Sequence, residues 1–456
     1  MHRGLLPLLL AVLPIFSEQP LSADDQAVSK ETMALEKLFV DAIERAEPSV
    51  VCILVTRNAN AALGEPETVP ESFGSGVVVG EREQRGLILT NYHVVREAAR
   101  LFVRLSGGKG SAADVFAADP RSDLAVLRLH DPVPVKRLEM GDGDGVRKGQ
   151  IVLSIANPFA AGFQDGSASA SWGIISNIRR RAPGKTASRE QDLSKLTIHH
   201  FGTLLQIDAR LNLGCSGGAL IDLKGKLIGL TTAQAALAGG ETAGGFAVPM
   251  NARIKEIVGK LMQGQEVEYG FLGVRFDRVS SRRVGGDGVH VSQVIPGSPA
   301  YHARLRPPAT ILAINGVPVH DNDDLFLNIG TLLAGSKADL QLQGYARPIT
   351  VTLAKYYVPG PIIASNRPSP VHGIRVDYTS VLMQKTNTSG EIPTGVYVSE
   401  VQPGSPADVA RLQDAVITHV NGAPVETPAD FYREAAKRPG PIELTVANRT
   451  EKVKLE

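Results

Sequence analysis

The chain has 456 residues, which is too long for a single hydrophobic core and predicts two to four domains. Its formal net charge of +1 argues against nucleic acid or an anionic membrane surface as a partner. The composition includes 46 Gly and 29 Pro but only 5% aromatic residues, which favours short strands and turns over long helices.

The N-terminus has the layout of a secretory signal peptide. A basic residue, Arg3, precedes an apolar run from Leu5 to Phe16 that is too short to span a bilayer comfortably. Small residues and then two aspartates follow the run, so we expect cleavage near Ala23 and an exported, soluble mature protein. A buried N-terminal helix or an uncleaved anchor is the alternative.

The next segment has helical spacing and then the spacing of strands. Between Glu31 and Ala46, four apolar residues fall on one face of a short helix: Leu35, Leu38, Phe39 and Ile43. Short apolar runs follow, nearly all separated by turn residues, at 50–55, 76–79, 87–90, 124–127, 151–153, 204–207 and 227–230. This pattern predicts an all-β barrel or sandwich domain at residues 31–258.

The C-terminal part contains an internal repeat. The segment GVHVSQVIPGSPAYHARL at 288–305 matches GVYVSEVQPGSPADVARL at 395–412. We therefore expect two copies of one module, at 267–356 and 371–456, joined by a Pro-rich linker. An Asn-Gly pair in each copy, at 315–316 and 421–422, predicts a hairpin turn.

Three residues of the first domain could together hydrolyse a peptide bond. A serine nucleophile needs a base to take its proton, a carboxylate to orient that base, and donors for the oxyanion. His93 in LILTNYHVV, Asp123 in DPRSDLAVLRL and Ser216 in NLGCSGGAL each lie at the edge of an expected strand. Their order is that of chymotrypsin-like double barrels. The sequence therefore predicts Ser216 as nucleophile, His93 as base and Asp123 as its carboxylate, with the N–H groups of Gly214 and Ser216 as the oxyanion hole.

These motifs resemble those of the HtrA (Deg) family of serine proteases, as do ANPF at 156–159 and GFAVPM at 245–250. The repeated module resembles the PDZ domain of that family through PGSPA and INGVPV or VNGAPV. The resemblance implies a mainly β protein, with a chymotrypsin-like double β-barrel protease domain followed by two PDZ domains. It also implies an ATP-independent, periplasmic or secreted endopeptidase that degrades unfolded or damaged proteins, often acts as a chaperone, and assembles as trimers or multiples of trimers. No metal or organic cofactor is required.

Two features depart from the family pattern. The family usually has Asn before the nucleophile, where this chain has Cys215. Because backbone groups bind the oxyanion, we expect the thiol to be tolerated, although it loses the hydrogen bonds of an amide; a redox latch is the alternative. The other cysteine is Cys52, and we expect two separate buried thiols rather than a bridge. The segment between ANPF and Gln206, which contains the polar stretch 182–195, is longer than in the family and is either a regulatory loop or a solvated one.

Substrate specificity is expected to depend on residues around the nucleophile. Arg210 lies six positions before Ser216, where chymotrypsin-like folds line the primary specificity pocket. If Arg210 pointed into the pocket, it would favour substrates with an acidic residue before the cleaved bond. We expect it instead to face solvent, so that Leu211 or Leu213 forms an apolar wall of the pocket. The strand edge along which substrate would pair is expected at three residues: Thr231, Thr232 and Ala233.

Two further stretches invite a binding role. A PDZ domain captures a C-terminal carboxylate in the backbone N–H groups of one loop, which we expect in the first copy at Gly270, Phe271, Leu272 and Gly273; an ordinary turn is the alternative. The matching stretch of the second copy, 371–374, fits less well and would bind another ligand or serve assembly. His199 and His200 lack further metal ligands at suitable spacing, and we expect both at the surface.

The sequence as a whole predicts an exported quality-control protease that acts on unfolded or misfolded proteins and binds C-terminal peptides at its first PDZ domain. A non-proteolytic chaperone or PDZ scaffold with an idle protease fold is the alternative from another class, and the complete triad argues against it. A processing protease with one dedicated substrate would use the same chemistry and also stays open.

Overall fold

The computed structural model describes residues 30–59, 72–180, 197–232, 245–276, 288–386, 390–438 and 440–456. The expected signal peptide at 1–23 and the loop at 182–195 lie outside these residues. Among the described residues the architecture is mainly β, and none of the helices there is long and apolar enough to span a bilayer.

Six strands close into a first barrel in the order β5-β4-β1-β2-β3-β6, with β6 pairing back onto β5. They are β1 (Val50–Thr56), β2 (Ser72–Arg82), β3 (Arg85–Asn91), β4 (Arg100–Arg104), β5 (Gly110–Asp119) and β6 (Leu124–Leu129). The expected apolar runs at 50–55, 76–79, 87–90 and 124–127 all lie in these strands.

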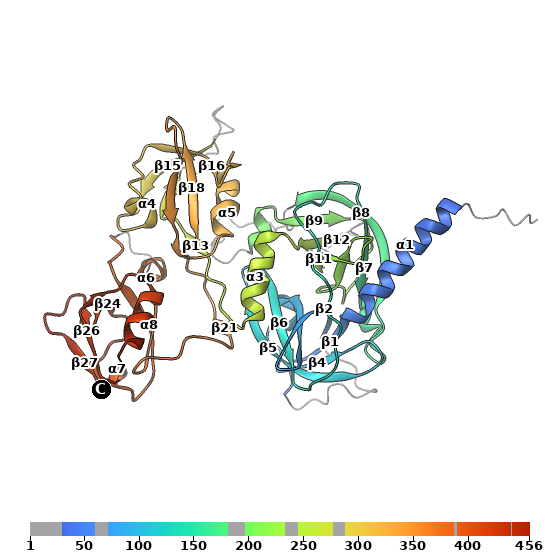
Figure 1. Ribbon diagram of the computed structural model, residues 1–456, viewed down its shortest axis with the longest axis horizontal. Helices are drawn as coiled ribbons and strands as arrows, with labels where there is room; N and C mark the ends of the chain where they lie inside the picture. Colours follow the sequence, from blue (N-terminus) through green and yellow to red (C-terminus); the bar gives the residue numbers. More distant parts are fainter. Residues whose placement is uncertain are drawn as a thin grey trace, which may run out of the picture.

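A second closed barrel has the order β10-β11-β12-β9-β8-β7 and lies against the first (Figure 1). Its strands are β7 (Ile151–Ala156), β8 (Ser169–Arg180), β9 (Leu204–Ile207), β10 (Ala219–Ile221), β11 (Leu227–Thr232) and β12 (Gly245–Pro249). Two closed barrels in sequence are the expected chymotrypsin-like arrangement, which the structure confirms.

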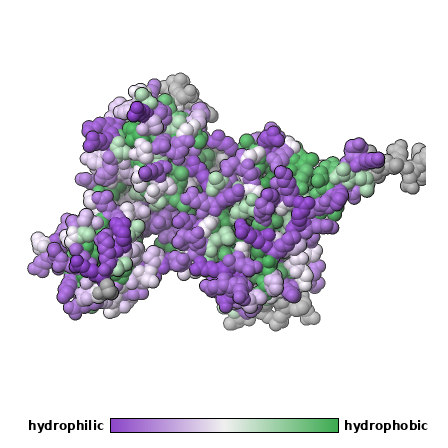
Figure 2. Space-filling model, in the orientation of Figure 1, coloured by the Kyte–Doolittle hydropathy of each residue, from purple (hydrophilic) through white to green (hydrophobic). Residues whose placement is uncertain are grey.

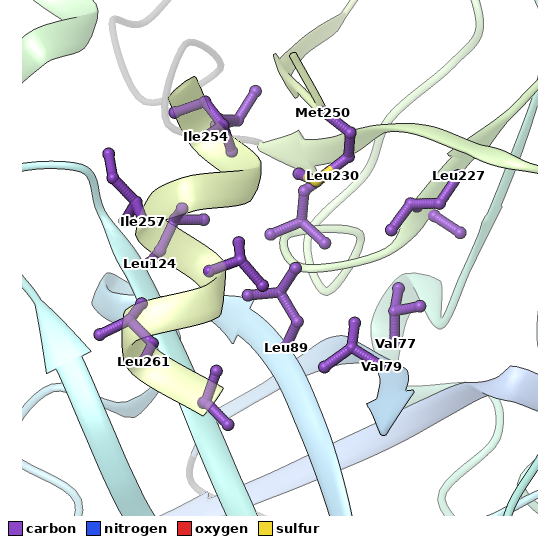
Figure 3. Packing of buried hydrophobic residues seen from close by; sticks show 14 of the residues in the cluster. Val77, Val79, Leu89, Leu124, Leu227, Leu230, Met250, Ile254, Ile257 and Leu261 are labelled. Carbon is purple, nitrogen blue, oxygen red and sulfur yellow. The ribbon is translucent and has the colours of Figure 1, made fainter. Parts of the chain in front are cut away.

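The two barrels share one hydrophobic core, which helix α3 (Ala252–Met262) covers. Asn251 caps the helix by accepting the Ile254 N–H, and Ile254, Ile257 and Leu261 then face the barrels at helical spacing (Figure 3). Each large aliphatic side chain buried in this way contributes about 1.5–3 kcal/mol. The core therefore holds the barrels in a fixed relation, and the loops between them form the site described below.

The helix expected at 31–46 is α1 (Lys30–Ala46), which extends away from the second barrel (Figure 1). Phe39 and Ile43 pack against the core, as their spacing predicts. Leu35 and Leu38 from the same predicted face are 43% and 46% exposed. Only half of the apolar face is therefore covered within one chain.

The C-terminal half folds into two modules. The first contains β13 (Gly270–Phe271), β14 (Val274–Phe276), β15 (Val289–Val294), α4 (Pro299–His302), β16 (Ala309–Ile314), β17 (Val317–Pro318), α5 (Asn322–Gly330), β18 (Lys337–Leu342), β19 (Ile349–Thr352) and β20 (Ala354–Lys355). The second contains β22 (Ile374–Tyr378), α6 (Thr379–Thr386), β23 (Val396–Val401), α7 (Pro406–Val409), β24 (Val416–Val420), β25 (Ala423–Pro424), α8 (Pro428–Ala436), β26 (Ile442–Val446) and β27 (Val453–Leu455).

The repeated motifs form the same local structures in both modules. The sheets follow equivalent paths, β14-β15-β16-β18-β19 and β22-β23-β24-β26-β27. The Ser-Pro pair of PGSPA starts a short helix each time, with Ser298 or Ser405 as the cap and proline at the first turn. Each Asn-Gly pair has positive φ at both residues and joins two paired strands, as predicted.

The segment predicted as a simple linker does more than connect the modules. Its residues Ile363–Ala364 form β21, which pairs with Ala117 and Ala118 of β5 as a seventh strand on the first barrel. The Ser365 N–H then donates to the Phe116 carbonyl (3.1 Å). The linker is therefore docked on the barrel through backbone hydrogen bonds, which its Pro-rich composition did not indicate.

Candidate functional site

His93 and Asp123, which are 30 residues apart, lie in direct contact. His93 lies in the short helix α2 (Tyr92–Val95) that directly follows β3. Its Nδ1–H donates to Asp123 Oδ2 (2.7 Å), and its backbone N–H donates to Oδ1 of the same carboxylate (2.9 Å). One buried carboxylate therefore fixes both the ring and the backbone of the histidine.

Asp123 lies in the tight turn between β5 and β6 and has a left-handed backbone, with φ of 55°. The side chain of Asp119 shapes this turn by accepting the backbone N–H groups of Arg121 (3.3 Å) and Ser122 (2.9 Å). The Asp123 carbonyl accepts the Tyr92 N–H (2.9 Å). The turn and the helix that carries His93 are thus tied together by backbone as well as side chains.

Ser216 lies in the turn before β10 and is 6% exposed. The Ser75 side chain of β2 donates to the Gly214 carbonyl (2.7 Å), and the Ser75 N–H donates to the Ser216 carbonyl (2.8 Å). Gly217 has φ of 85°, and a Cβ there would overlap the Ser75 carbonyl oxygen, so this position requires glycine. A strand of the first barrel therefore holds the serine turn of the second.

The serine turn and the histidine helix approach each other at Gly74. A Cβ at Gly74 would stand 2.5 Å from Cγ1 of Val94 and 3.3 Å from the Ser216 carbonyl oxygen. Val94 directly follows His93, so the absence of a side chain at Gly74 lets these two segments meet. The segments that carry the three residues singled out by the sequence analysis thus meet at this point.

The peptide bond before Gly214 has a defined orientation. The Leu213 carbonyl accepts the backbone N–H of Phe159, from the ANPF segment (2.7 Å). In a trans peptide the following N–H points the opposite way, so the Gly214 N–H faces away from Phe159. Gly214 itself has φ of 95°, which favours glycine.

Cys215 fits into the same turn without a disulfide. Its Sγ accepts the Asn212 N–H (3.4 Å), and its carbonyl accepts the Thr231 hydroxyl (2.6 Å). Burial raises the pKa of the Cys215 thiol and raises that of Cys52 to about 12. Both cysteines are free and buried, as predicted.

The residues predicted to set specificity differ in their exposure. Arg210 and Leu213 are exposed, and Leu211 is half-buried and reaches the backbone of Gly245. Arg210 is therefore solvent-accessible, in line with the expected orientation.

The strand edge expected at 231–233 differs from the prediction. The Thr231 N–H donates to the Gly218 carbonyl and its carbonyl accepts the Gly217 N–H, while Thr232 pairs with Phe246 of β12. These backbone groups are already used by the closed barrel, so they offer no open edge; Ala233 lies outside the described residues.

The expectation that both histidines of the 199–200 pair lie at the surface is wrong for His199. His199 lies in the 3₁₀ helix η4 (Ile198–Phe201) and is 2% exposed. Its Nε2 contacts the Ser122 carbonyl (2.8 Å) and its Nδ1 contacts the Thr203 hydroxyl (2.6 Å). His200 is half-buried and its Nδ1 faces Thr197.

The sequence analysis also missed the contacts between the Asp123 turn and the first module. The Tyr269 hydroxyl donates to the Asp119 carboxylate, and Arg121 lies between the rings of Tyr269 and Tyr356, 4.9 and 4.6 Å from their centroids. Tyr269 directly precedes the stretch expected to bind a peptide carboxylate. The Arg in DPRSD was the available signal, but nothing in the sequence identified its aromatic partners.

The loop expected to bind a carboxylate has the same backbone design in both modules. Gly273 has φ of 82° and its carbonyl accepts the Ile295 N–H (2.9 Å), close beside the Ser298 side chain. Gly373 has φ of 89° and lies equally close to Ser405. The second copy, which matches less well in sequence, therefore has the same turn.

Comparisons with known proteins agree with this architecture. A model of the trypsin-like peptidase domain matches residues 74–230, and a PDZ domain model matches residues 270–354. The chain is 28% identical to the periplasmic pH-dependent serine endoprotease DegQ of Escherichia coli (strain K12), over 98% of this chain and 98% of DegQ. It is 31% identical to the periplasmic serine endoprotease DegP of Salmonella typhimurium (strain LT2), over 82% of this chain and 74% of DegP.

Solved structures give the same result. The HtrA-type protease AlgW with a tripeptide superimposes with a TM-score of 0.51 and 26% identity, over 71% of this chain and 98% of that chain. The double barrel, the following PDZ modules and these relatives lead to one assignment. The chain belongs to the HtrA (Deg) family of trypsin-like serine endoproteases with PDZ domains.

Proposed function

We propose that the chain cleaves unfolded or misfolded proteins with a triad of His93, Asp123 and Ser216. The observation that carries the proposal is the 2.7 Å hydrogen bond from His93 Nδ1 to Asp123 Oδ2, beside the glycine-rich turn that presents Ser216. We keep residues 31–258 as the proposed protease domain and 267–356 and 371–456 as the proposed PDZ domains.

The triad performs acyl transfer in two halves. Ser216 Oγ attacks the peptide carbonyl carbon while its proton passes to His93 Nε2, and the C–N bond then breaks as His93 returns that proton to the leaving amine. Water releases the acyl group from Ser216 by the same steps in the second half. Asp123 remains charged throughout, holds the proton of the imidazole on Nδ1, and stabilises the imidazolium that forms.

The N–H groups of Gly214 and Ser216 stabilise the oxyanion of the tetrahedral intermediate. The hydrogen bond from the Phe159 N–H to the Leu213 carbonyl supports this role. It fixes the peptide plane between Leu213 and Gly214, so that the carbonyl points toward Phe159 and the Gly214 N–H points in the opposite direction. Leu211 and Leu213 contribute apolar surface near the cut, and Arg210 remains in solvent.

The first PDZ domain binds the C-terminal residues of peptides in the loop from Gly270 to Gly273. The Gly270 N–H already donates to the Leu332 carbonyl (2.7 Å), so the bonds to the carboxylate come from the N–H groups further along the loop. The positive φ of Gly273 and the equivalent geometry at Gly373 support this assignment, since such turns expose successive N–H groups to a carboxylate. Substrates or activating peptides enter the protein's own sheet as an added strand.

The protein acts outside the cytoplasm, in the periplasm or as a secreted protein, and serves protein quality control under stress. The apolar run from Leu5 to Phe16 and the periplasmic relatives DegQ and DegP support export. No nucleotide is needed, because the acyl-transfer steps use only side-chain and backbone groups.

The chain assembles as a homotrimer or a multiple of trimers. Large apolar side chains are exposed where α1 meets the second barrel, visible as a green patch in Figure 2. They are Met33 (53%), Leu35 (43%), Leu38 (46%), Val40 (46%) and Trp172 (62%). The Trp172 ring lies 5.8 Å from that of Phe39, so apolar side chains of β8 and α1 meet there.

The test compares the mature protein with its Ser216→Ala variant on an unfolded protein substrate. We expect the variant to lose cleavage by about 10⁵- to 10⁶-fold, because no other group can form the acyl intermediate. Ser72→Ala, a half-buried serine of β2 outside the turn, is the control and keeps the wild-type rate.

Cleavage by the Ser216→Ala variant at the wild-type rate would contradict the proposed nucleophile. If neither protein cleaves while both suppress aggregation of the substrate, the triad is idle and a chaperone or scaffold function replaces the proposed one. Cleavage of a single native protein, with unfolded substrates left intact, would instead support a dedicated processing protease.

A further inference from the structure

The turn that carries Asp123 is held by a second histidine. The Asp123 backbone is left-handed, a conformation that costs most non-glycine residues about 1–2 kcal/mol and that Asp tolerates better than most. Every carbonyl from Arg121 to Asp123 accepts a bond from another segment. The Ile198 N–H donates to Arg121 (2.9 Å), His199 Nε2 contacts Ser122 (2.8 Å), and the Tyr92 N–H donates to Asp123 (2.9 Å).

The Asn91 side chain also donates to the Asp123 carbonyl (3.2 Å), and the Ser122 carbonyl takes its bond from the His199 side chain. Ser122 directly precedes Asp123, so the orientation of this carbonyl sets the peptide plane that enters the left-handed residue. Ile198 and His199 both belong to η4, which lies 77 residues further along the chain. The short helix therefore holds two successive carbonyls of the turn.

The partners of His199 define its proton. A carbonyl oxygen only accepts, so Nε2 carries a hydrogen and donates to Ser122. Burial lowers the pKa of His199, and the nearby charge of Asp123 acts in the opposite direction but more weakly. The ring is thus neutral at pH 7, and its Nδ1 lone pair accepts the Thr203 hydroxyl. The Ser122 carbonyl thus fixes the tautomer, and the bond to Thr203 fixes the ring orientation.

We propose that His199 is a positioning residue for the proposed triad: its Nε2–H holds the Ser122 carbonyl and so aims the Asp123 carboxylate at His93. The inference rests on the proposed function, because it assigns His199 a task in the same site. It touches no reacting atom; its effect passes through Asp123. A loss of this bond lets the turn relax and misplaces the carboxylate, and displacements of about 1 Å cost about 10²-fold in rate.

The experiment compares two amides of different reach. In His199→Gln the side-chain nitrogen lies near the position of Nε2 and still donates to Ser122. In His199→Asn the amide lies near the position of Nδ1, so it reaches Thr203 but not Ser122. We expect kcat on a fluorogenic peptide to fall about 10- to 100-fold in His199→Asn, with KM within about threefold, and to stay within about fivefold of wild type in His199→Gln.

His200→Asn is the matched control, because its ring faces Thr197 rather than the Asp123 turn. It keeps the wild-type kcat. Equal losses in His199→Gln and His199→Asn, or no loss in either, would overturn the positioning role, since neither result depends on the bond to Ser122.

A spectroscopic measurement separates this inference from the proposed function. The proton between His93 Nδ1 and Asp123 gives a far-downfield NMR resonance, assigned by its loss in His93→Ala and observable without any turnover. We expect it in wild type and in His199→Gln, and expect it shifted or broadened in His199→Asn. If the resonance is unchanged in His199→Asn, the inference is overturned. If the wild-type protein shows the resonance but cleaves no substrate, the result counts against the proposed function alone.

If His199→Asn does not fold, as judged by circular dichroism, Thr203→Val takes its place. This variant keeps the ring but removes the hydroxyl that fixes it, and we expect a three- to tenfold loss of kcat with a shifted resonance. Wild-type kcat and an unchanged resonance in Thr203→Val would overturn the proposal.

Discussion

The Cys215 side chain lies beside Ser216 in the turn before β10 and is 4% exposed. Its sulfur accepts one backbone N–H, from Asn212, and makes no bond to the groups proposed to bind the oxyanion. Burial raises the pKa of this thiol, so its thiolate fraction at pH 7 is smaller than that of a free cysteine. Cys215 therefore fills space in the turn, and its sulfur binds the backbone of Asn212, where the turn begins.

Cys215→Ser should therefore keep kcat/KM within about threefold of wild type, because the hydroxyl also accepts the Asn212 N–H and the backbone donors stay in place. In the native protein both thiols should resist an aromatic disulfide reagent at pH 7, and both should react after denaturation. Rapid labelling of the native protein, or activity that changes with reductant, would revive the redox latch.

Residue types and their order at strand edges were enough to single out His93, Asp123 and Ser216, although their catalytic roles stay predictions until the variants are measured. The same reasoning placed His199 at the surface. In the segment TIHHF (197–201) nothing local tells which of the two adjacent histidines turns inward, because the deciding partner, Ser122, is 77 residues away. Side-chain roles that depend on distant backbone groups are therefore outside the reach of a sequence pattern.

At the scale of elements, β2 is the strand that couples the two barrels at the site. Ser75 uses its hydroxyl twice, donating to the Gly214 carbonyl (2.7 Å) and accepting the Asn157 N–H (2.8 Å). Asn157 belongs to the ANPF segment, whose Phe159 in turn holds Leu213. One buried hydroxyl thus joins the serine turn to the segment that orients it.

Ser75→Ala removes both bonds and leaves a buried carbonyl and a buried N–H unpaired, which costs about 1–3 kcal/mol for each group. We expect the free energy of unfolding to fall by about 2–4 kcal/mol and kcat to fall about tenfold, as measured by denaturant unfolding and peptide cleavage. Ser72→Ala on the same strand is the control and changes neither. Full activity in a destabilised Ser75→Ala would show that the bond supports the fold without orienting the serine turn.

Elements with a strong local signal were predicted well. The apolar runs became strands, the Asn-Gly pairs became hairpin turns, and the Ser-Pro pairs became helix starts, because each depends on residues a few positions apart. The strand β21 was not predictable in this way. Its partner is β5, where Ile363 pairs with Ala118, more than two hundred residues earlier in the chain. A Pro-rich segment carries no sign of such pairing.

At the scale of the whole molecule, the first PDZ module contacts the same structures that hold Asp123 of the proposed triad. Tyr269 bonds Asp119 of the Asp123 turn, and the ring of Phe326 from α5 stacks on Phe201 of η4 with centroids 5.2 Å apart. The turn that contains Asp123 and the helix η4 that holds this turn are therefore both in contact with the first PDZ module. Domain order was predictable from the repeat, but these contacts depend on how folded surfaces meet.

The exposed apolar side chains on α1 and β8 predict where the subunits of the proposed oligomer contact each other. Leu38 and Trp172 are 46% and 62% exposed in one chain, and burial of each against another copy would contribute about 1.5–3 kcal/mol. The double variant Leu38→Ser/Trp172→Ser should thus weaken association by about 10²- to 10⁴-fold. Light scattering after size exclusion should give a trimer or its multiple for wild type and a monomer for the variant at micromolar concentration.

Tyr345→Ser is the control for that experiment, because Tyr345 is 54% exposed but lies on the first PDZ module, away from α1. It should assemble as wild type does. A monomeric wild type would contradict the assembly outright, and an oligomer that survives the double variant would place the interface elsewhere. Because His93 and Asp123 are bonded within one chain, a folded monomeric variant that still shows the His93–Asp123 resonance would separate the formation of this pair from assembly.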